Sequence, residues 1–357
     1  MRGIIIAKYT NAERMFRVLE RKEPDMVPHF ELGIDRKVMN KILPGASFEE
    51  FIEHMDWDAL MSIDRDFWEV EVLDESRRIF RDEWGTLKSY THEYVPVPLE
   101  ATIKSEKELE NYQPPDPDKE SRFEQIQRWV KRYKGERAII AMVMDHNSMT
   151  SDLLGFEERL MAFYTNPELV LRVHQMVLDY FLRYINNVIE AGADIILIGG
   201  DWAYKNGPMF SLEHYHKFVL PPFKAMVQQA KKRGVYVMKH SDGNCWSFLD
   251  SIIEAGVDGF HPIDPTADMD IGEAKQKYGD RLCLIGNVDC AATLSFGTVE
   301  EVRQETKDVI RKAGVGGGLI VASSNTIHSA VKPENYVEMV RAIREYGQYP
   351  LDIKALS

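Results

Sequence analysis

The chain has few cysteines and no long hydrophobic run. Only three of its 357 residues are cysteine, and an odd, small number in a chain of this size does not build a disulfide framework. No stretch approaches the ~20 uninterrupted apolar residues that a membrane-spanning helix needs. We therefore expect neither a disulfide-stapled secreted fold nor a membrane protein.

The chain is also short of positive charge. It has 44 lysines and arginines against 57 aspartates and glutamates, a net charge of −13 at pH 7. Nucleic-acid binding needs basic stripes, so we expect no nucleic-acid partner, and the acidic balance also disfavours a substrate with many carboxylates. The apolar stretch within residues 1–8 is too short for a signal peptide and lacks a cleavage site, which predicts a cytoplasmic protein.

A glycine-rich nucleotide-binding loop is missing as well. No Gly-x-Gly-x-x-Gly follows the first strand candidate, and the glycine-rich residues 314–318 precede a strand instead. The chain has in its place a regular alternation of short apolar runs and helical patterns, which is typical of right-handed βαβ units around a parallel sheet. The strand candidates are residues 27–32, 58–63, 138–144, 195–199, 235–239, 257–260, 282–285 and 319–321.

Eight strands, each followed by a helix, predict a closed (β/α)₈ TIM-type barrel that forms a single domain over residues 1–357, with a helical segment at the amino terminus. An open doubly wound sheet is the alternative. The rhythm breaks at residues 67–88, where polar and apolar residues alternate by twos around a polar turn, which indicates an inserted β-hairpin. Ser47 and Glu50 predict a capping box at the start of a helix over residues 48–55.

Polar residues follow directly after successive strand candidates, which is the feature that indicates an enzyme. The carboxyl ends of the strands in a parallel barrel converge on one face, where barrel enzymes keep their active sites. We therefore expect the polar side chains at these exits to meet in one site. They are Asp145 and His146, Asp201 and Trp202, His240 and Asp242, His261, Asn287, and Asn325.

His240 and Asp242 are the first candidates for catalysis or for metal binding. They are two residues apart beyond a strand, so their side chains can point the same way, and they could form an acid/base pair or half of a metal site. The alternative is structural, with Asp242 capping the next helix and His240 a satisfied core imidazole. Asp201, after two glycines that allow a close approach of backbone or ligand, is a third catalytic candidate or a turn-forming residue.

Five further residues are candidates for substrate binding. Asn287 has the neutral donor and acceptor groups that orient a substrate oxygen. His261 and Asn325 also follow strands, while His146 could equally belong to a simple polar loop and Trp202 to the core.

The cysteines allow one further metal hypothesis. Cys245 and Cys290 lie near the same predicted face as His240, so the three could form a zinc site, although their spacing matches no standard zinc signature. Cys283 falls inside a strand and is expected in the core.

At these residues the chain resembles the uroporphyrinogen decarboxylase-like superfamily, and within it the methyltransferases that exchange methyl groups with corrinoid proteins. The resemblance covers nearly the whole chain and depends on the order and spacing of several short motifs. These are Asp-Glu-Trp-Gly at 82–85, Gly-Asp-Trp at 200–202 with Ser211 and Tyr215, His-Ser-Asp-Gly at 240–243, His-Pro-Ile-Asp at 261–264, Gly-Asn-Val-Asp at 286–289, and Ser-Asn-Thr-Ile-His at 324–328 with Lys-Pro-Glu-Asn at 332–335.

Two departures from the family pattern bear on activity. The decarboxylase grips a polycarboxylate tetrapyrrole with an arginine-rich loop after its first strand, whereas residues 31–37 here hold one arginine, one lysine and two acids. Family members that activate a thiol hold Zn²⁺ with a His-x-Cys pair and a distant cysteine. Here His240 matches, but Asp242 and Asn325 stand at the cysteine positions, a harder set that suits a thiolate-activating zinc poorly.

The resemblance implies a methyltransferase that removes a methyl group from a small substrate, an O-methyl aromatic ether in our hypothesis. The acceptor would be the Co(I) corrinoid (cobalamin) of a separate carrier protein. A departing phenolate, with an unperturbed pKa of about 10, needs a general acid or a Lewis-acid metal beside the ether oxygen. We expect His240 and Asp242 to supply it, as an acid or as ligands of a Zn²⁺ ion.

Two other functions stay open. A decarboxylase acting on a smaller carboxylic acid would need cationic groups, for which Arg36, Lys205 and Lys239 are the candidates. A non-catalytic barrel could use the same pocket to bind a small molecule. The sequence is compatible with a homodimer and does not identify the methyl donor.

Overall fold

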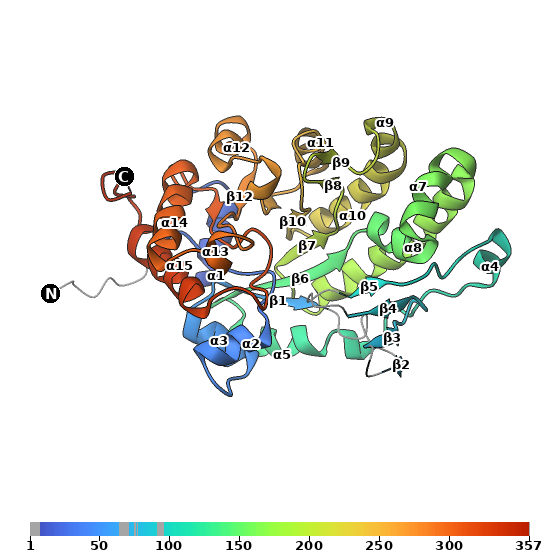
Figure 1. The fold of residues 1–357 in the computed structure, drawn as a ribbon, viewed down its shortest axis with the longest axis horizontal. Coiled ribbons are helices and arrows are strands. Elements are labelled where there is room, and N and C mark those ends of the chain that lie inside the picture. Colours follow the sequence, from blue (N-terminus) through green and yellow to red (C-terminus); the bar gives the residue numbers. More distant parts are fainter. Residues whose placement is uncertain (1–7, 64–70, 75, 77, 91–95, 357) are drawn as a thin grey trace.

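A curled sheet of seven parallel strands forms the centre of the computed structural model (Figure 1), which describes residues 8–63, 71–74, 76, 78–90 and 96–356. The strands are hydrogen-bonded in the order β1-β6-β7-β10-β11-β12-β13, without reversal. Their bounds are Ala59–Ile63 (β1), Ala138–Met144 (β6), Ile195–Gly199 (β7), Tyr236–His240 (β10), Gly259–His261 (β11), Cys283–Ile285 (β12) and Leu319–Ile320 (β13). A TIM-type barrel fold is thereby confirmed.

The strands are apolar throughout because both faces of the sheet are covered. In β7, Ile195 and Leu197 face the inside of the barrel, whereas Ile196 and Ile198 face the layer between the sheet and the outer helices. Helix α1 (Asn11–Leu19) adds Met15 to the inner cluster and lies at the amino ends of the strands. The amino end of the barrel is therefore plugged by apolar side chains, and the carboxyl end is left for chemistry.

The barrel is closed by a segment that is not a regular strand. The first strand candidate, residues 27–32, lies between β13 and β1, where the Pro28 carbonyl accepts from Val321 N–H (3.0 Å) and the His29 carbonyl accepts from Asp58 N–H (2.8 Å). Proline has no N–H to donate, and His29 N–H donates to the Asp58 carboxylate at 2.8 Å. The eighth position of the barrel is thus filled, but the prediction of a full strand there was wrong.

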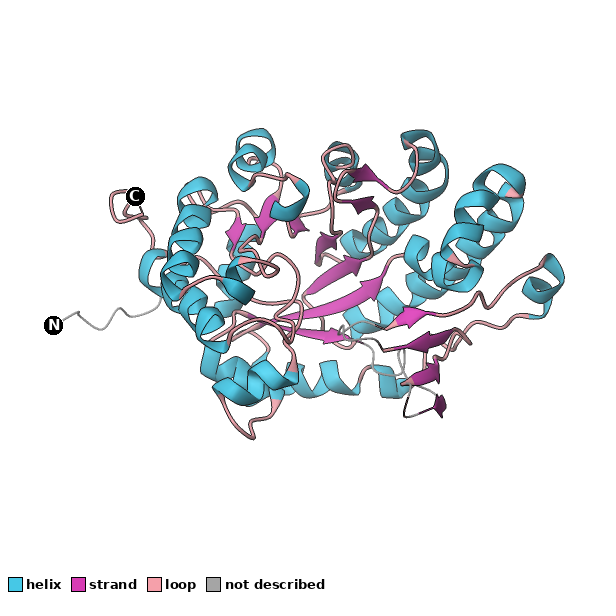
Figure 2. Ribbon diagram, viewed as in Figure 1, coloured by secondary structure: helices cyan, strands magenta, loops and turns pink. Residues whose placement is uncertain are grey.

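Helices surround the strands on the outside (Figure 2). Most follow the strand that precedes them in the chain, as right-handed βαβ units require. They are α5 (Glu124–Tyr133), α6 (His146–Leu154), α7 (Phe156–Thr165), α8 (Pro167–Glu190), α9 (Leu212–His214), α10 (Leu220–Lys232), α11 (Leu249–Ala255), α12 (Ile271–Tyr278), α13 (Thr293–Phe296), α14 (Val299–Ala313) and α15 (Pro333–Tyr346). Within the described part of the chain, no helix is both long enough and apolar enough to cross a membrane.

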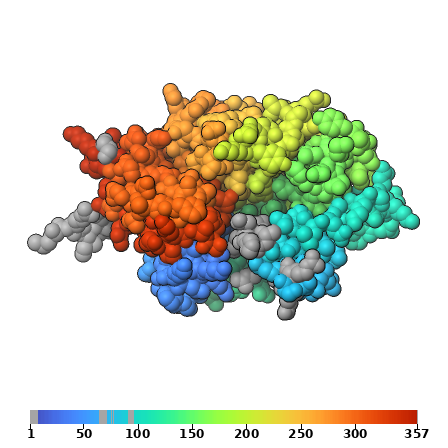
Figure 3. Space-filling view, in the orientation of Figure 1, coloured from blue at the N-terminus to red at the C-terminus, as the bar shows by residue number. Residues whose placement is uncertain are grey.

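The amino-terminal helices α2 (Arg36–Ile42) and α3 (Phe48–Met55) pack below the carboxyl-terminal helices, and Figure 3 shows this blue segment directly beneath the red one. Helix α3 begins as predicted. Ser47 Oγ accepts from the backbone N–H of Glu50, and the Glu50 carboxylate accepts from the backbone N–H of Ser47, a complete capping box.

A separate antiparallel sheet lies outside the barrel. Its strands are β2 (Glu71–Asp74), β3 (Ile79–Arg81), β4 (Leu87–Ser89) and β5 (Val97–Pro98), and the short helix α4 (Glu106–Asn111) follows. The pairing of β2 with β3 confirms a hairpin within residues 67–88, although residues 67–70, 75 and 77 are outside the described residues. The hairpin belongs to a larger unit, because β4 and β5 extend it to four strands.

Candidate active site

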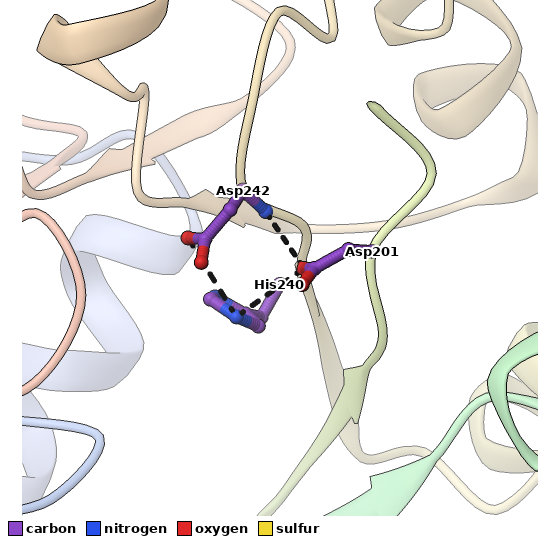
Figure 4. Close-up of side chains that lie close together, drawn as sticks. All are labelled: Asp201, His240 and Asp242. Carbon is purple, nitrogen blue, oxygen red and sulfur yellow. Dashed lines mark hydrogen bonds and ion pairs between the residues drawn. The ribbon is translucent and has the colours of Figure 1, made fainter. Parts of the chain in front are cut away.

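Three side chains converge at the carboxyl end of the barrel (Figure 4): Asp201, His240 and Asp242. His240 ends β10, Asp242 follows two residues later, and Asp201 lies two residues beyond the end of the neighbouring strand β7. His240 Nε2 lies 3.8 Å from Asp201 Oδ1 and 3.8 Å from Asp242 Oδ1. The backbone N–H of Asp242 also donates to Asp201 Oδ1 at 2.9 Å. The three catalytic candidates are therefore together, as neighbouring parallel strands require.

Glycines allow the chain to make this arrangement. Gly200, at φ +151°, lies so close to the start of α6 that a Cβ there would be 2.3 Å from Ser148 Oγ and 2.6 Å from Asp145 Cγ. Gly243, at φ +85°, would place a Cβ 2.6 Å from the Ala203 carbonyl oxygen. These distances exclude any side chain. Gly200 therefore lets the loop that carries Asp201 lie against the start of α6, and Gly243 lets the loop that carries Asp242 approach the loop that carries Asp201.

Burial determines the protonation of the cluster. Burial and the nearby Lys239 ammonium lower the pKa of His240 to about 3, so its imidazole is neutral at pH 7. Burial together with the carboxylates of Asp201 and Asp264 raises the pKa of Asp242 well above its ordinary value. Burial, with the neighbouring acids Asp145 and Asp264, also raises the pKa of Asp201. The cluster therefore favours an added proton or cation.

The cluster stands on a buried ion pair. Lys239 Nζ lies 3.0 Å from Asp145 Oδ2 and donates to the Gly200 carbonyl at 2.6 Å. The Trp202 indole donates to the same Asp145 oxygen at 2.6 Å, and its ring lies 4.2 Å below Lys239 Nζ. Trp202 has no exposed surface, so it supports the site from beneath and does not form a wall of the pocket. This pairing was not predicted from the sequence, although Asp145 follows the end of β6 and Lys239 lies near the end of β10.

Asn325 is one of two predicted substrate-binding residues that contact the cluster. It follows β13, and its side-chain amide donates to Asp242 Oδ2 at 2.5 Å. Asn287 is only 6% exposed, and its amide donates to the Ile263 carbonyl at 2.8 Å, which holds the loop after β11. One of its two amide N–H groups is therefore occupied by the backbone.

His146 and His261, both predicted to bind substrate, are buried away from the open side of the cluster. His146 is fully buried on α6, and its ring packs edge-on against His174 at 4.9 Å between centroids. It therefore faces the helix layer and not the site. His261 does contact the cluster, on the Nδ1 side of His240, the ring nitrogen that is not the one near Asp201 and Asp242. Its Nδ1 lies 2.9 Å from His240 Nδ1, and it is fully buried.

The cysteine hypothesis for zinc is not supported by the geometry. Among the described residues, the one group of three or more side chains with metal-ligand spacing is Asp201, His240 and Asp242. Burial raises the pKa of the Cys245 thiol to about 12 and that of the Cys290 thiol to about 11, so both stay protonated. A thiolate is the form that binds metal.

The residues that are present fit a hard divalent cation. One imidazole nitrogen and two carboxylate oxygens lie within 4.8 Å of one another. Asp242 Oδ1 is a buried atom that has no hydrogen-bond partner among the described residues. Carboxylate oxygens suit Mg²⁺ or Mn²⁺, and an imidazole nitrogen together with carboxylate oxygens also suits a catalytic Zn²⁺. Asp201, His240 and Asp242 could therefore hold such an ion.

A large cavity lies at the other end of the barrel. Its volume is about 1130 Å³, and its lining includes Arg14, Arg17, Arg344 and Asp25. Arg14 is already paired with Asp25 at 2.6 Å. None of the candidate site residues lines it.

Comparison with known proteins agrees with the fold. The family model for uroporphyrinogen decarboxylase (URO-D) matches residues 86–346, and the chain belongs to this family. The family is one of enzymes.

Individual relatives are distant. The chain is 25% identical to a uroporphyrinogen decarboxylase of Pseudoalteromonas atlantica over 69% of this chain and 70% of that one. It is 27% identical to the uroporphyrinogen decarboxylase of Alkalilimnicola ehrlichii over 68% and 67% of the two chains. A methyltransferase from Methanosarcina mazei has the same fold, with a TM-score of 0.75 at 19% identity over 95% of this chain and 99% of that one.

Proposed function

We propose that this protein is a methyltransferase that takes a methyl group from an aromatic methyl ether and transfers it to the corrinoid of a separate carrier protein. A Co(I) corrinoid supplies the nucleophile that accepts the methyl group. The task of this chain is then to bind the ether and to stabilise the phenolate that departs. The observation that carries the proposal is the acidic Asp201–His240–Asp242 cluster, which favours an added proton or cation where a leaving oxygen would need it.

Two roles for the cluster follow from its chemistry. Asp242, whose raised pKa lets it keep a proton to higher pH than an ordinary aspartate, can donate that proton to the ether oxygen. Alternatively, the cluster holds a divalent cation that stabilises the same oxygen as a Lewis acid. Asn325, whose amide contacts Asp242, orients the carboxylate in either case. Metal analysis of the purified protein separates the two roles.

Decarboxylation is the second candidate, favoured by the names of the relatives. Among the described residues, none of the three cationic candidates forms an ion pair with Asp201 or Asp242. Lys239 is fully buried and paired with Asp145, and Arg36 and Lys205 are exposed. The residue at the first strand exit, Glu31, is an acid. A site with two carboxylates repels a polycarboxylate substrate, so methyl transfer is the better match.

The test is a methyl-transfer assay with a purified corrinoid carrier protein reduced to Co(I) and a panel of methoxylated aromatic compounds. Absorbance follows the methylated corrinoid. We expect methyl transfer by the wild type and a loss of about 100-fold or more in His240→Ala, because the variant removes one member of the cluster that supplies the proton or holds the cation. His54→Ala, at an exposed histidine of α3, is the matched control. Turnover of uroporphyrinogen without methyl transfer would overturn the proposal.

A further inference from the structure

A buried column of hydrogen bonds runs from the barrel wall to the back of His240. Ser323 Oγ donates to Glu31 Oε2 at 2.6 Å, and the Ser323 backbone N–H donates to the same carboxylate at 3.0 and 3.1 Å. His261 Nε2 lies 3.3 Å from the Ser323 carbonyl oxygen, and His261 Nδ1 lies 2.9 Å from His240 Nδ1. Glu31, Ser323 and His261 are at most 1% exposed.

The direction of each hydrogen bond can be assigned. A carbonyl oxygen only accepts, so His261 Nε2 carries a proton. His261 is fully buried and, among the described residues, has no carboxylate in ion-pair distance, so its ring is neutral and its Nδ1 is an acceptor. The short contact between the two Nδ1 atoms therefore needs a proton on His240 Nδ1. His240 Nε2 lies 3.8 Å from the nearer oxygens of Asp201 and Asp242, beyond hydrogen-bond distance, so in the neutral ring it has no proton.

We infer that Glu31, Ser323 and His261 are positioning residues that hold His240 in the Nδ1–H tautomer, with the lone pair of Nε2 directed at Asp201 and Asp242. Glu31 fixes both donors of Ser323, which aims the Ser323 carbonyl at His261. His261 in turn presents an acceptor to His240. A partner on one ring nitrogen sets what the other nitrogen can do.

This inference deepens the proposed function and rests on it only for its catalytic consequence. With a bare Nε2, His240 cannot be the group that protonates the ether oxygen. It is instead an acceptor for the proton of Asp242 or a ligand for a cation. The proton or positive charge that meets the departing oxygen must then come from Asp242 or from that cation.

The test uses ¹⁵N-histidine-labelled full-length protein at neutral pH, without substrate. Long-range ¹H–¹⁵N spectra distinguish a protonated ring nitrogen from a bare one, and the signals of His240 are assigned from their loss in His240→Gln. We expect a protonated Nδ1 and a bare Nε2 at His240, and the opposite pattern at His261. A proton on Nε2 of His240 in the wild type would overturn the inference without the need for any variant.

Two variants test whether His261 imposes the tautomer. His261→Leu removes the acceptor, and we expect the His240 signals to change to a mixture of tautomers or to the Nε2–H form. His261→Asn places an oxygen near the former Nδ1, and we expect it to restore the wild-type pattern. An unchanged His240 in folded His261→Leu would show that the column does not set the tautomer. If the protein gave the expected spectra but transferred no methyl group, the proposed function would be wrong and the tautomer inference would stand.

Discussion

Lys239 and Asp145 form an ion pair 3.0 Å long in which neither side chain has any exposed surface. The pair joins the carboxyl end of strand β10 to the start of α6, directly beneath the loop that carries Asp201. Removing one member of a buried pair leaves a charge without a partner, which costs far more than the pair itself contributes. The pair therefore makes a specific prediction about stability.

Lys239→Met should destabilise the protein by about 3–5 kcal/mol, because the Asp145 carboxylate stays buried without its cation. The double variant Lys239→Met/Asp145→Asn should recover a good part of this loss. Urea denaturation measures both values. Lys277→Met, in an exposed pair with Glu273, is the control and should leave the free energy of unfolding nearly unchanged. Equal losses in the single and double variants would contradict the electrostatic explanation.

The pH dependence of methyl transfer should reveal the protonation state of Asp242. Its pKa is raised by burial and by Asp201 and Asp264, so the protonated acid persists to higher pH than an ordinary aspartate. If that proton reaches the ether oxygen, the wild-type rate should fall as pH rises through the raised pKa. Asp242→Asn should be slower by about 100-fold and should lose this limb. A wild-type rate that rises over the same range would favour a bound cation.

Glu31 should make stability fall as pH rises. Burial raises its pKa in the folded protein to about 8, from 4.5 for an ordinary glutamate. Between these values the folded state binds more protons than the unfolded state, so its contribution to stability is present below about pH 4.5 and is lost as pH rises through about 8. The slope is at most about 1.4 kcal/mol per pH unit.

Glu31→Gln keeps an acceptor for Ser323 and cannot ionise, so its thermal midpoint should fall less than that of the wild type between pH 6 and 9. Parallel curves for the two proteins would show that Glu31 does not titrate in this range.

Gly200→Ala should be much more harmful than a similar change at Gly45. Both glycines have positive φ, which costs an alanine about 1–2 kcal/mol, but nothing lies within 4 Å of a Cβ at Gly45. At Gly200 the added methyl would collide with Ser148 and Asp145 at 2.3–2.6 Å. We expect lower stability and lower methyl transfer in Gly200→Ala, and a modest loss of stability alone in Gly45→Ala. Similar results for both would mean that α6 can move away freely.

The sequence predicted the barrel well because its strands are covered on both faces. Such strands are unbroken apolar runs, and β6 and β7 match the predicted ranges at both ends. The segment at residues 27–32 does not form the regular strand that was predicted, because Pro28 has no N–H to donate and the N–H of His29 bonds to the Asp58 side chain. Strands β4 and β5 were missed because they are short, and Val97 in β5 is exposed, so they leave no apolar pattern.

The location of the site could be predicted from the sequence, but the direction of each side chain could not. A position after a strand determines the edge at which a residue lies, and this brought Asp201, His240 and Asp242 together. It does not determine the direction of a side chain. His146 begins a helix, so its side chain turns toward α8, and Trp202 turns beneath the loop. Glu31 was overlooked as a site residue because only the folded barrel places it beside Ser323.

The seam of the barrel, where residues 27–32 lie between β13 and β1, is joined in part by carboxylates. Asp58 accepts from the His29 backbone, and Glu31 accepts from the Ser323 backbone. The β6–β7 and β10–β11 joins have a similar bond each, where Asp194 accepts from Ile139 N–H and Asp258 accepts from Val237 N–H, but there a regular ladder of amide-to-amide bonds lies beside it. At the seam no regular ladder backs up the carboxylates, so substitution of a single acid can alter how the cylinder closes.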